Sequence, residues 1–371
     1  MGWNTIGAMD MPKQHFPTVH LLWADSLKII AMFGVVLIHS AAPLLIAYRE
    51  RGPVVWWIGN LYDSLARCCI PIFFMLSGAL LLNAAGRMPP GVFLRRRFRR
   101  IGIPFLFWSA VYFIWEKTFN RGGIPYLSFL GNIIREPTYY HLWFLYVLMG
   151  LYLIAPLLGI YVHTAGRRNK TYLLMLWLAF GSIVPFLELY FDTPVYFMAS
   201  TPNSVFRYAG FFMLGHFLHH ARRTARHRII FAMLFIVGFA ATLLGTYFVT
   251  VIEAGGTFNG VFYEYYSPNV ALMAAALFML WRRVPKSVSD QPTSLKSRII
   301  TMVAAGTPGV YLVHALVISI LNRGIIGFAL DQFILHPSLG VPLFAIIVFV
   351  VSLGIVSIMR TIPGMRELVI A

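Results

Sequence analysis

Two basic side chains in the first apolar segment have the types and spacing for acid–base chemistry. Lys28 and His39 are eleven residues apart. At 100° per residue this is about three helical turns, so both lie on one helix face, about 16 Å apart along the axis. His39 is therefore a candidate general base or nucleophile, and the sequence leaves that choice open. The structural alternatives are a lysine that reaches lipid headgroups and a histidine that hydrogen-bonds a neighbouring helix.

Further polar side chains fall at a similar depth in other apolar segments. Asp63 and Arg67 have the i,i+4 spacing of a helical ion pair. His141 and His314 both lie in the half of the membrane away from the arginine run, His141 at the start of its segment and His314 toward the end of its own. Several polar groups at one depth indicate a shared cavity, in which Arg67 could stabilise an oxyanion or bind an acceptor. The alternatives are a plain interfacial ion pair and, for the aromatic residues around 139–144, an interfacial belt.

Carboxylates near this depth are candidates to orient the imidazole of His39. Asp63 and Glu264 are the two that the sequence offers, and only their proximity in the fold would assign the role. The histidines lie on separate segments, and no carboxylate follows them at a spacing typical of metal ligands. We therefore expect no metal site.

A run of arginines at 95–100, interrupted only by Phe98, lies at the opposite end of the expected spans. Arginine binds phosphate through paired hydrogen bonds, so the run is a candidate site for a polyanion. The candidates are Arg96, Arg99 and Arg100. The alternative is a topology signal that also touches anionic lipids. Ser77, next to Gly78, could contact a ligand or allow two helices to approach closely.

The elements that position these residues are membrane helices. The chain has 371 residues, of which 59% are hydrophobic and 12% charged, and its mean hydropathy is +0.73. This composition excludes a soluble enzyme, a disordered chain and a disulfide scaffold. We expect an all-α integral membrane protein with one domain over 1–371 and an N-terminal segment, 1–24, before the first span. The ten expected spans are 27–47, 62–82, 101–118, 141–161, 172–191, 204–219, 229–251, 262–281, 299–321 and 341–359.

The basic residues predict the orientation of these spans. The chain has 30 Lys and Arg residues against 13 Asp and Glu, a net charge of +17. Most of the Lys and Arg residues fall in the loops on the side of the two termini, which makes both termini cytoplasmic. The positive charge is therefore interpreted as membrane topology rather than as nucleic-acid binding. The adjacent Cys68 and Cys69 are expected to be small buried hydrophobes.

Four motifs in order over residues 25–316 resemble the acyltransferase-3 family of integral membrane acyltransferases. The family has Arg, ten residues and then His on the first helix, where this chain has Lys28 and His39. The stretches 67–78, 140–145 and 311–314 resemble three further motifs, and the arginine run contains the family's Arg-x-x-Arg pattern. Residues 132–145 resemble bacterial O-acetyltransferases of surface polysaccharides, of the enterobacterial common antigen type. Lysine in place of arginine keeps the charge but loses the bidentate fork, which leaves donor binding in question.

The resemblance implies an O-acetyltransferase in the bacterial inner membrane. It would move acetyl from cytoplasmic acetyl-CoA, its co-substrate, to a sugar hydroxyl of a surface polysaccharide or exopolysaccharide, or of a lipid-linked precursor, on the outer side. Its partners would be membrane lipids, that acceptor and polysaccharide biosynthesis machinery, without nucleic acid. We assign catalysis to His39, Arg67 and His314, donor binding to Lys28, Arg96, Arg99, Arg100 and Ser77, and acceptor binding to Asp63, His141, Trp143 and Glu264.

The competing class is a transporter or flippase for polysaccharide precursors. It would explain a polar cavity at one depth but not the first-helix spacing, and the paired repeats of many transporters are not evident. A third possibility is the same fold with another donor, such as succinyl-CoA, or with a peptide or antibiotic acceptor. The sugar, the hydroxyl position and the oligomeric state stay open.

Overall fold

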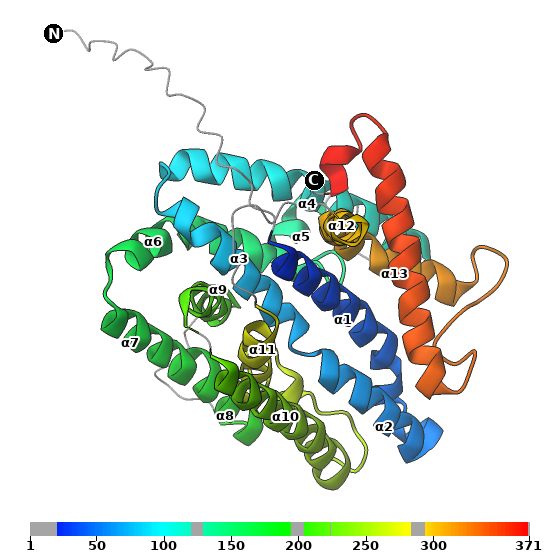
Figure 1. Ribbon diagram of the computed structural model, residues 1–371. Helices are drawn as coiled ribbons and strands as arrows, with labels where there is room; N and C mark the ends of the chain where they lie inside the picture. Colours follow the sequence, from blue (N-terminus) through cyan, green and yellow to red (C-terminus); the bar gives the residue numbers. More distant parts are fainter. Residues whose placement is uncertain (1–20, 120–128, 194–203, 223, 283–293, 370–371) are drawn as a thin grey trace.

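The computed structural model describes residues 21–119, 129–193, 204–222, 224–282 and 294–369. Most of the expected N-terminal segment, 1–24, lies outside the described residues. Over the described ranges the protein is helical and contains no strand (Figure 1). The helices are α1 (Leu22–Ile46), α2 (Tyr48–Ala66), α3 (Cys69–Ala85), α4 (Pro90–Phe119), α5 (Phe129–Arg135), α6 (Trp143–Thr164), α7 (Arg167–Trp177), α8 (Val184–Phe191), α9 (Ser204–His220), α10 (Ala225–Tyr247), α11 (Pro268–Trp281), α12 (Leu295–Arg323), α13 (Pro337–Thr361) and the short η5 (Arg366–Val369).

Within the described residues, seven helical stretches are long and apolar enough to cross a membrane. They are Leu22–Ile46, Tyr48–Ala85, Trp143–Thr164, Arg167–Phe191, Arg226–Glu253, Leu295–Arg323 and Pro337–Thr361. Three further expected spans fall on α4, which carries the arginine run, and on α9 and α11, which have 17 and 14 residues. The length and composition of these helices are those of a multi-pass membrane protein. The number of about ten spans stays a prediction.

Two elements differ from the expected boundaries. Residues 48–66 form α2, where the sequence suggested mostly a loop, and Gly52 breaks this helix with φ 80°. The expected span 262–281 becomes an α-helix only at Pro268, after a short 3-10 helix at Val261–Tyr263. Proline is favoured in the first turn of a helix because its missing N–H would have no partner there. The residues before Pro268 instead pack into the protein, and Tyr263 is 3% exposed.

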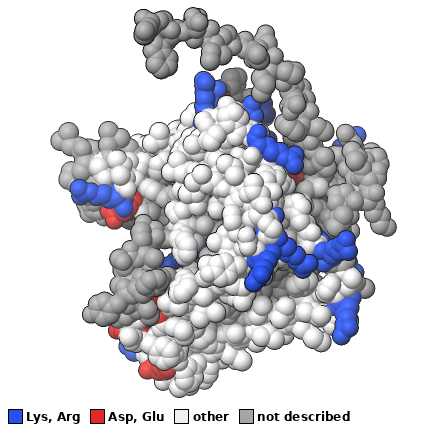
Figure 2. Space-filling model, turned by 90° about the vertical axis from the view of Figure 1, so that its left-hand side faces the viewer, with Lys and Arg blue, Asp and Glu red and all other residues white. Residues whose placement is uncertain are grey.

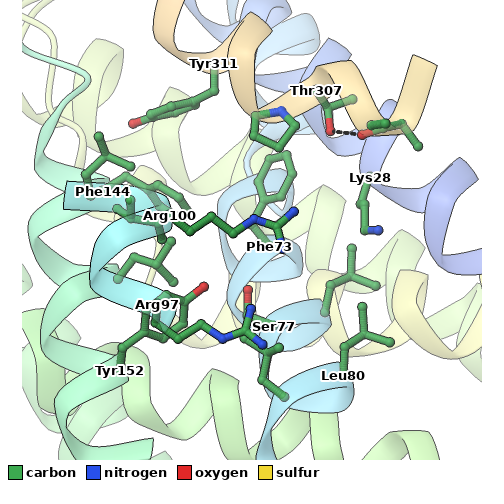
Figure 3. A pocket seen from close by; sticks show the side chains of 18 residues that line it. Lys28, Phe73, Ser77, Leu80, Arg97, Arg100, Phe144, Tyr152, Thr307 and Tyr311 are labelled. Atoms are coloured by element: carbon green, nitrogen blue, oxygen red, sulfur yellow. Dashed lines mark hydrogen bonds between the residues drawn. The ribbon is translucent and has the colours of Figure 1, made fainter. Parts of the chain in front are cut away.

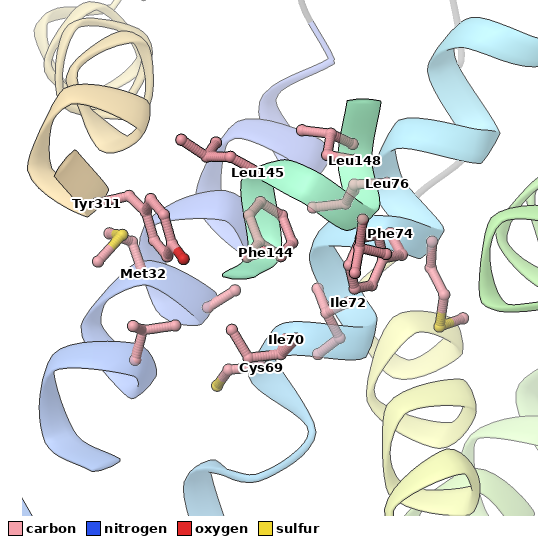
Figure 4. Close-up of a cluster of buried hydrophobic side chains, with 14 of the residues drawn as sticks. Met32, Cys69, Ile70, Ile72, Phe74, Leu76, Phe144, Leu145, Leu148 and Tyr311 are labelled. Atoms are coloured by element: carbon pink, nitrogen blue, oxygen red, sulfur yellow. The ribbon is translucent and has the colours of Figure 1, made fainter. Parts of the chain in front are cut away.

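Helix α1 is the central element of the bundle and packs against α2, α3, α12 and α13 (Figure 1). Helices α1 and α12 run in the same direction, since Lys28 and Thr307 line one cavity while His39 stacks on His314 further along both helices. An apolar cluster between α1, α3, α6 and α12 holds this arrangement (Figure 4). It contains Cys69, which is buried and free, as is Cys68.

Both described ends of the chain lie at one end of the bundle, together with the first half of α4. Arg99 of α4 forms an ion pair of 3.2 Å with Glu367 of η5, and the indole of Trp108 donates a hydrogen bond to the carbonyl oxygen of Leu368. On the face in Figure 2, Lys and Arg side chains lie mostly toward the top and the right-hand edge of a broad uncharged area. The cytoplasmic orientation of this end stays a prediction.

Helices α3 and α9 approach each other so closely that their backbones touch. A Cβ atom placed on Gly78 would lie 1.7 Å from the carbonyl oxygen of Phe212, and one on Gly215 would lie 1.9 Å from that of Met75. Real Cβ atoms do not come this close to backbone, so both positions require glycine. Small residues at such crossings let membrane helices pack tightly, and this crossing fixes the face of α3 that carries Ser77.

Candidate functional site

Three histidines from distant parts of the chain meet in the centre of the bundle. The ring of His39 (α1) stacks on that of His314 (α12) with centroids 5.3 Å apart, and the ring of His141, just before α6, lies 5.1 Å from that of His314. His314 and His141 are buried, at 0% and 2% exposure, whereas His39 is half-buried. These three residues are called the histidine cluster below. His39 is its most accessible member.

A backbone hydrogen bond fixes the orientation of the buried ring of His314, and another bond holds the backbone of His141. Nδ1 of His314 lies 2.7 Å from the carbonyl oxygen of Tyr311, so this nitrogen carries the proton and donates it. The other ring nitrogen of His314, Nε2, is then an acceptor. The hydroxyl of Tyr311 in turn donates to the carbonyl oxygen of His141. Within the described part of the chain His39 has no hydrogen-bond partner, which leaves its nitrogens available to a substrate.

Arg67 lies where the chain turns from α2 into α3, among acidic and aromatic side chains. Its guanidinium pairs with the carboxylate of Asp63 and lies 4.3 Å from the ring centroid of Tyr263 and 5.3 Å from that of Tyr265. Tyr265 also stacks on Trp143. Arg67 is close enough to the histidine cluster for its charge to act on the ring of His39. Asp63 therefore orients Arg67, and no hydrogen bond joins Asp63 to His39 in the described structure.

The buried ion pair gives a first prediction, on stability. Asp63→Asn should lower the free energy of unfolding by about 3 kcal/mol, because it leaves the largely buried guanidinium of Arg67 without its counter-charge. The side chains of Arg67 and Asp63 are 14% and 0% exposed. Thermal unfolding in detergent, monitored by size-exclusion chromatography, measures the loss of stability. Asp331→Asn is the control, at a residue outside the bundle core. Equal transition temperatures for both variants would contradict the prediction.

Glu264, in the segment between α10 and α11, lies outside the helices that could cross a membrane. Burial raises the pKa of its carboxyl, while the positive charges of Arg67 and Arg207 act to lower it. Glu264 thus belongs to the electrostatic surroundings of Arg67. Among the described residues, no hydrogen bond links it to His39.

A cavity of about 280 Å³ leads from the arginine-rich end of the bundle toward the histidine cluster. Its charged lining residues are Lys28 of α1 and Arg97 and Arg100 of α4, which point into the same space as Ser77 of α3 (Figure 3). The space is called the cationic cavity below. Lys28 is also held by Asp25 at 2.9 Å. Three cations and four hydroxyl-bearing side chains, those of Ser77, Tyr152, Thr307 and Tyr311, in an otherwise apolar pocket suit a phosphorylated ligand with an apolar arm.

The far end of the cationic cavity reaches the histidine cluster through Tyr311 and Phe144. Both line the cavity. The ring of Tyr311 is 5.7 Å from that of His314, 5.5 Å from that of His141 and 5.2 Å from that of Phe144. A ligand held by the cations can therefore extend its apolar arm to the edge of the cluster. The wall between the two is only one aromatic ring thick.

The structure places the three arginines singled out from the sequence in two different surroundings. Arg100 lines the cationic cavity, but Arg96 and Arg99 do not, since Arg99 pairs with Glu367 and Arg96 faces Met88. Arg97 was not among the residues singled out from the sequence. Residues three apart share a helix face, so Arg97 and Arg100 form one stripe of α4 and Arg96 and Arg99 another. The spacing alone does not say which stripe faces inward.

Several aromatic residues of the site also escaped the sequence assignment. They are Tyr140, whose ring lies 4.9 Å from that of His39, Tyr311, and the pair Tyr263 and Tyr265 around Arg67. Tyr140 and Tyr311 stand inside motifs that the sequence singled out for their histidines. In the described residues no group of three or more His, Cys, Asp or Glu side chains could hold a metal ion.

Comparison with known proteins gives one match. Searches among curated proteins and among solved structures return nothing that matches the chain. A family model described as an acyltransferase domain, that of the acyltransferase-3 family, matches residues 21–360. The match covers nearly the whole chain and contains the histidine cluster, Arg67 and the cationic cavity. The chain therefore belongs to the acyltransferase-3 family and is a membrane acyltransferase.

Proposed function

We propose that the protein is an O-acetyltransferase that moves acetyl from acetyl-CoA to a sugar hydroxyl of a surface polysaccharide, an exopolysaccharide or a lipid-linked precursor. The observation that carries this proposal is the cationic cavity that ends at the histidine cluster. Acetyl-CoA has phosphates at one end and a thioester at the end of a thin, largely apolar arm. Lys28, Arg97 and Arg100 match the phosphates, and the apolar walls up to Tyr311 match the arm.

The proposed reaction places the proton transfer at His39. Its imidazole takes the proton of the sugar hydroxyl, and the hydroxyl oxygen forms a bond to the thioester carbonyl carbon. The negative charge on the carbonyl oxygen of the tetrahedral species is stabilised by Arg67. The carbon–sulfur bond then breaks, and the sulfur leaves as CoA after it receives the proton from His39. His314 supports His39 by stacking, and Asp63 holds Arg67 in place.

The setting of the reaction is part of the same proposal. Acetyl-CoA is a cytoplasmic metabolite, so the arginine-rich end would face the cytoplasm and the sugar would approach from the other side of a bacterial inner membrane. His141 and Trp143 lie where that sugar would reach the histidine cluster. The nucleotide stays at the cations and only the acyl arm enters the bundle. Partners would be the membrane lipids and polysaccharide biosynthesis machinery.

Acetyl-CoA turnover tests the proposal. The protein is reconstituted in lipid nanodiscs and given labelled acetyl-CoA with and without a lipid-linked glycan extract. We expect CoA release together with label in the glycan. If the label appears only as free acetate, or stays on acetyl-CoA although glycan is present, the proposal of an O-acetyltransferase is rejected. If succinyl-CoA is the faster donor, the transferred group is succinyl rather than acetyl, and the protein is still a membrane acyltransferase.

The arginine run provides a matched test of donor binding. Arg97→Ala and Arg100→Ala should each raise the KM for acetyl-CoA about tenfold or more, because each removes a charge-assisted hydrogen bond of about 1.5–3 kcal/mol. Arg96→Ala and Arg99→Ala remove the same charge from the other stripe of α4 and should change this KM less than twofold. Steady-state kinetics on the four variants measures the difference. A similar rise in all four would indicate general attraction rather than binding in the cationic cavity.

A further inference from the structure

A second cavity lies at the other end of α12, beyond the histidine cluster. It is open, has a volume of about 340 Å³ and is lined by Tyr139, Tyr140, Ser319, Asn322 and Arg323, with Ala315 and Ile318 at its base. It is called the tyrosine pocket below. None of these residues lines the cationic cavity. The two spaces therefore approach the histidine cluster from opposite directions.

The tyrosine pocket and the cluster share a wall. Tyr140 lines the pocket, and its ring lies edge-on against that of His39, with centroids 4.9 Å apart. Ala315, at the base of the pocket, follows His314 directly in α12. A group bound in the tyrosine pocket is therefore one aromatic ring away from His39. On the side of the cationic cavity, the ring in between is Tyr311, which contacts His314 and His141 of the cluster.

The floor of the pocket is rigid. Tyr139 stacks on Tyr112 with centroids 4.5 Å apart, and Tyr139 and Tyr140 are themselves in contact at 4.8 Å. The hydroxyl of Tyr112 donates to the carbonyl oxygen of Leu312 at 2.6 Å and accepts from the N–H of Leu316 at 3.2 Å. Tyr112 thus ties α4 to α12 under the pocket. A preorganised aromatic floor binds a ligand without the entropic cost of ordering.

The lining chemistry fits a sugar ring. The C–H face of a pyranose is apolar and packs on an aromatic face, while its hydroxyl groups need short polar partners around the rim. Tyr140 is 50% exposed and offers such a face, and the rim carries the amide of Asn322, the hydroxyl of Ser319 and the guanidinium of Arg323. An apolar surface with a few directed polar groups is the usual make-up of a small-ligand site.

We propose that the tyrosine pocket binds the acceptor, with a pyranose ring stacked on Tyr140 and its hydroxyl groups hydrogen-bonded to Asn322. This assignment rests on the proposed acyl transfer. It brings the acceptor to His39 from the side of Tyr140, while the thioester arrives from the cationic cavity, so that the two meet at the histidine cluster. It also moves acceptor recognition away from Asp63 and Glu264, which surround Arg67 instead.

Kinetics with both substrates tests the pocket. Labelled acetyl-CoA and a lipid-linked glycan extract are given to the wild type, Tyr140→Ala, Tyr140→Phe and Asn322→Ala in nanodiscs. For Tyr140→Ala and Asn322→Ala we expect at least a tenfold rise in the amount of extract needed for half-maximal transfer, with an unchanged Kd for acetyl-CoA. Tyr140→Phe keeps the stacking face and should change the half-saturation less than threefold. Ile326→Ala, an exposed position just past α12 that does not line the pocket, is the matched control.

The outcomes separate this proposal from the one on which it rests. If the wild type transfers acetyl and both Tyr140→Ala and Asn322→Ala keep its half-saturation for the extract, the acceptor binds elsewhere while the acyltransferase stands. A rise in the Kd for acetyl-CoA in these variants would assign the pocket to the donor instead. If the wild type consumes no acetyl-CoA at all, the proposed function fails, and the acceptor site fails with it.

Discussion

The His39→Ala variant should stay folded, and its rate of acetyl transfer should be about a thousandfold lower than that of the wild type. Removal of a general base costs about 10²–10⁴ in rate, and His39 is the member of the histidine cluster that a substrate can reach. Its ring is half-buried and has no hydrogen-bond partner among the described residues, so the substitution breaks no hydrogen bond and removes the stacking on His314 and the edge-on contact with Tyr140. Label transfer from acetyl-CoA to the glycan extract measures the loss.

The matched control is His163→Ala, at the far end of α6 from the cluster, where Nε2 of the ring donates one hydrogen bond to the carbonyl oxygen of Asn83. This variant should transfer acetyl at the rate of the wild type. Thermal unfolding in detergent must give similar transitions for both variants. Equal activity of His39→Ala and the wild type would keep the acyltransferase but remove His39 from its chemistry.

One covalent intermediate distinguishes a general base from a nucleophile at His39. A nucleophilic imidazole forms an acetyl-imidazole, so labelled acetyl should remain on the wild-type protein after rapid acid quenching when no glycan is present. A general base leaves the protein unlabelled under the same conditions. His39→Ala supplies the background for this experiment. The stacked geometry of His39 and His314 allows either role.

The second large effect concerns folding rather than chemistry. Gly78→Ala should lower the free energy of unfolding by more than about 3 kcal/mol, the upper range for overpacking a well-packed core. Its Cβ would collide with the backbone of Phe212, at 1.7 Å from the carbonyl oxygen. Backbone cannot rotate away as a flexible side chain does, so α3 and α9 must move apart. The unfolding temperature in detergent reports the change.

Gly102→Ala is the control for this substitution. Gly102 also lies inside a helix, α4, but a Cβ atom there would meet no atom within 4 Å. The same substitution should therefore be neutral or raise stability by about 0.5–1 kcal/mol, because alanine favours the helical backbone. A Gly78→Ala protein as stable as Gly102→Ala would show that the α3–α9 crossing has room that the structure does not show. Because Ser77 is next to Gly78, a displaced crossing should also weaken acetyl-CoA binding.

Much of the candidate site could be anticipated from helical spacing. Eleven residues between Lys28 and His39 put both on one face of α1, and in the structure one lines the cationic cavity while the other joins the histidine cluster. Similar depth was the argument for grouping His141 and His314 with His39, and their rings are in contact. These inferences need only the rise and the period of a helix, both of which are fixed by backbone geometry.

The rest depended on information that one sequence does not contain. The rotation of α4 about its axis selects Arg97 and Arg100 for the cavity, and that rotation is set by packing against α6 and η5 rather than by the arginine spacing. Likewise Glu264 falls within the expected span 262–281, near one end of a mostly apolar stretch. Its segment is instead irregular backbone that turns at Gly255 and Gly256, both with positive φ. Hydropathy cannot separate such a segment from the helix that follows it.

Helix α12 contributes to both cavities, and this has a consequence for how the protein can change. Residues 304–311 face the cationic cavity and residues 315–323 the tyrosine pocket, with His314 between them. Substitutions in the first stretch can alter one substrate without touching the contacts of the other. New combinations of donor and acceptor can therefore evolve by successive substitutions within a single helix. A chimera that exchanges only the last two turns of α12 with those of a family member should import that member's acceptor preference and keep the resident donor.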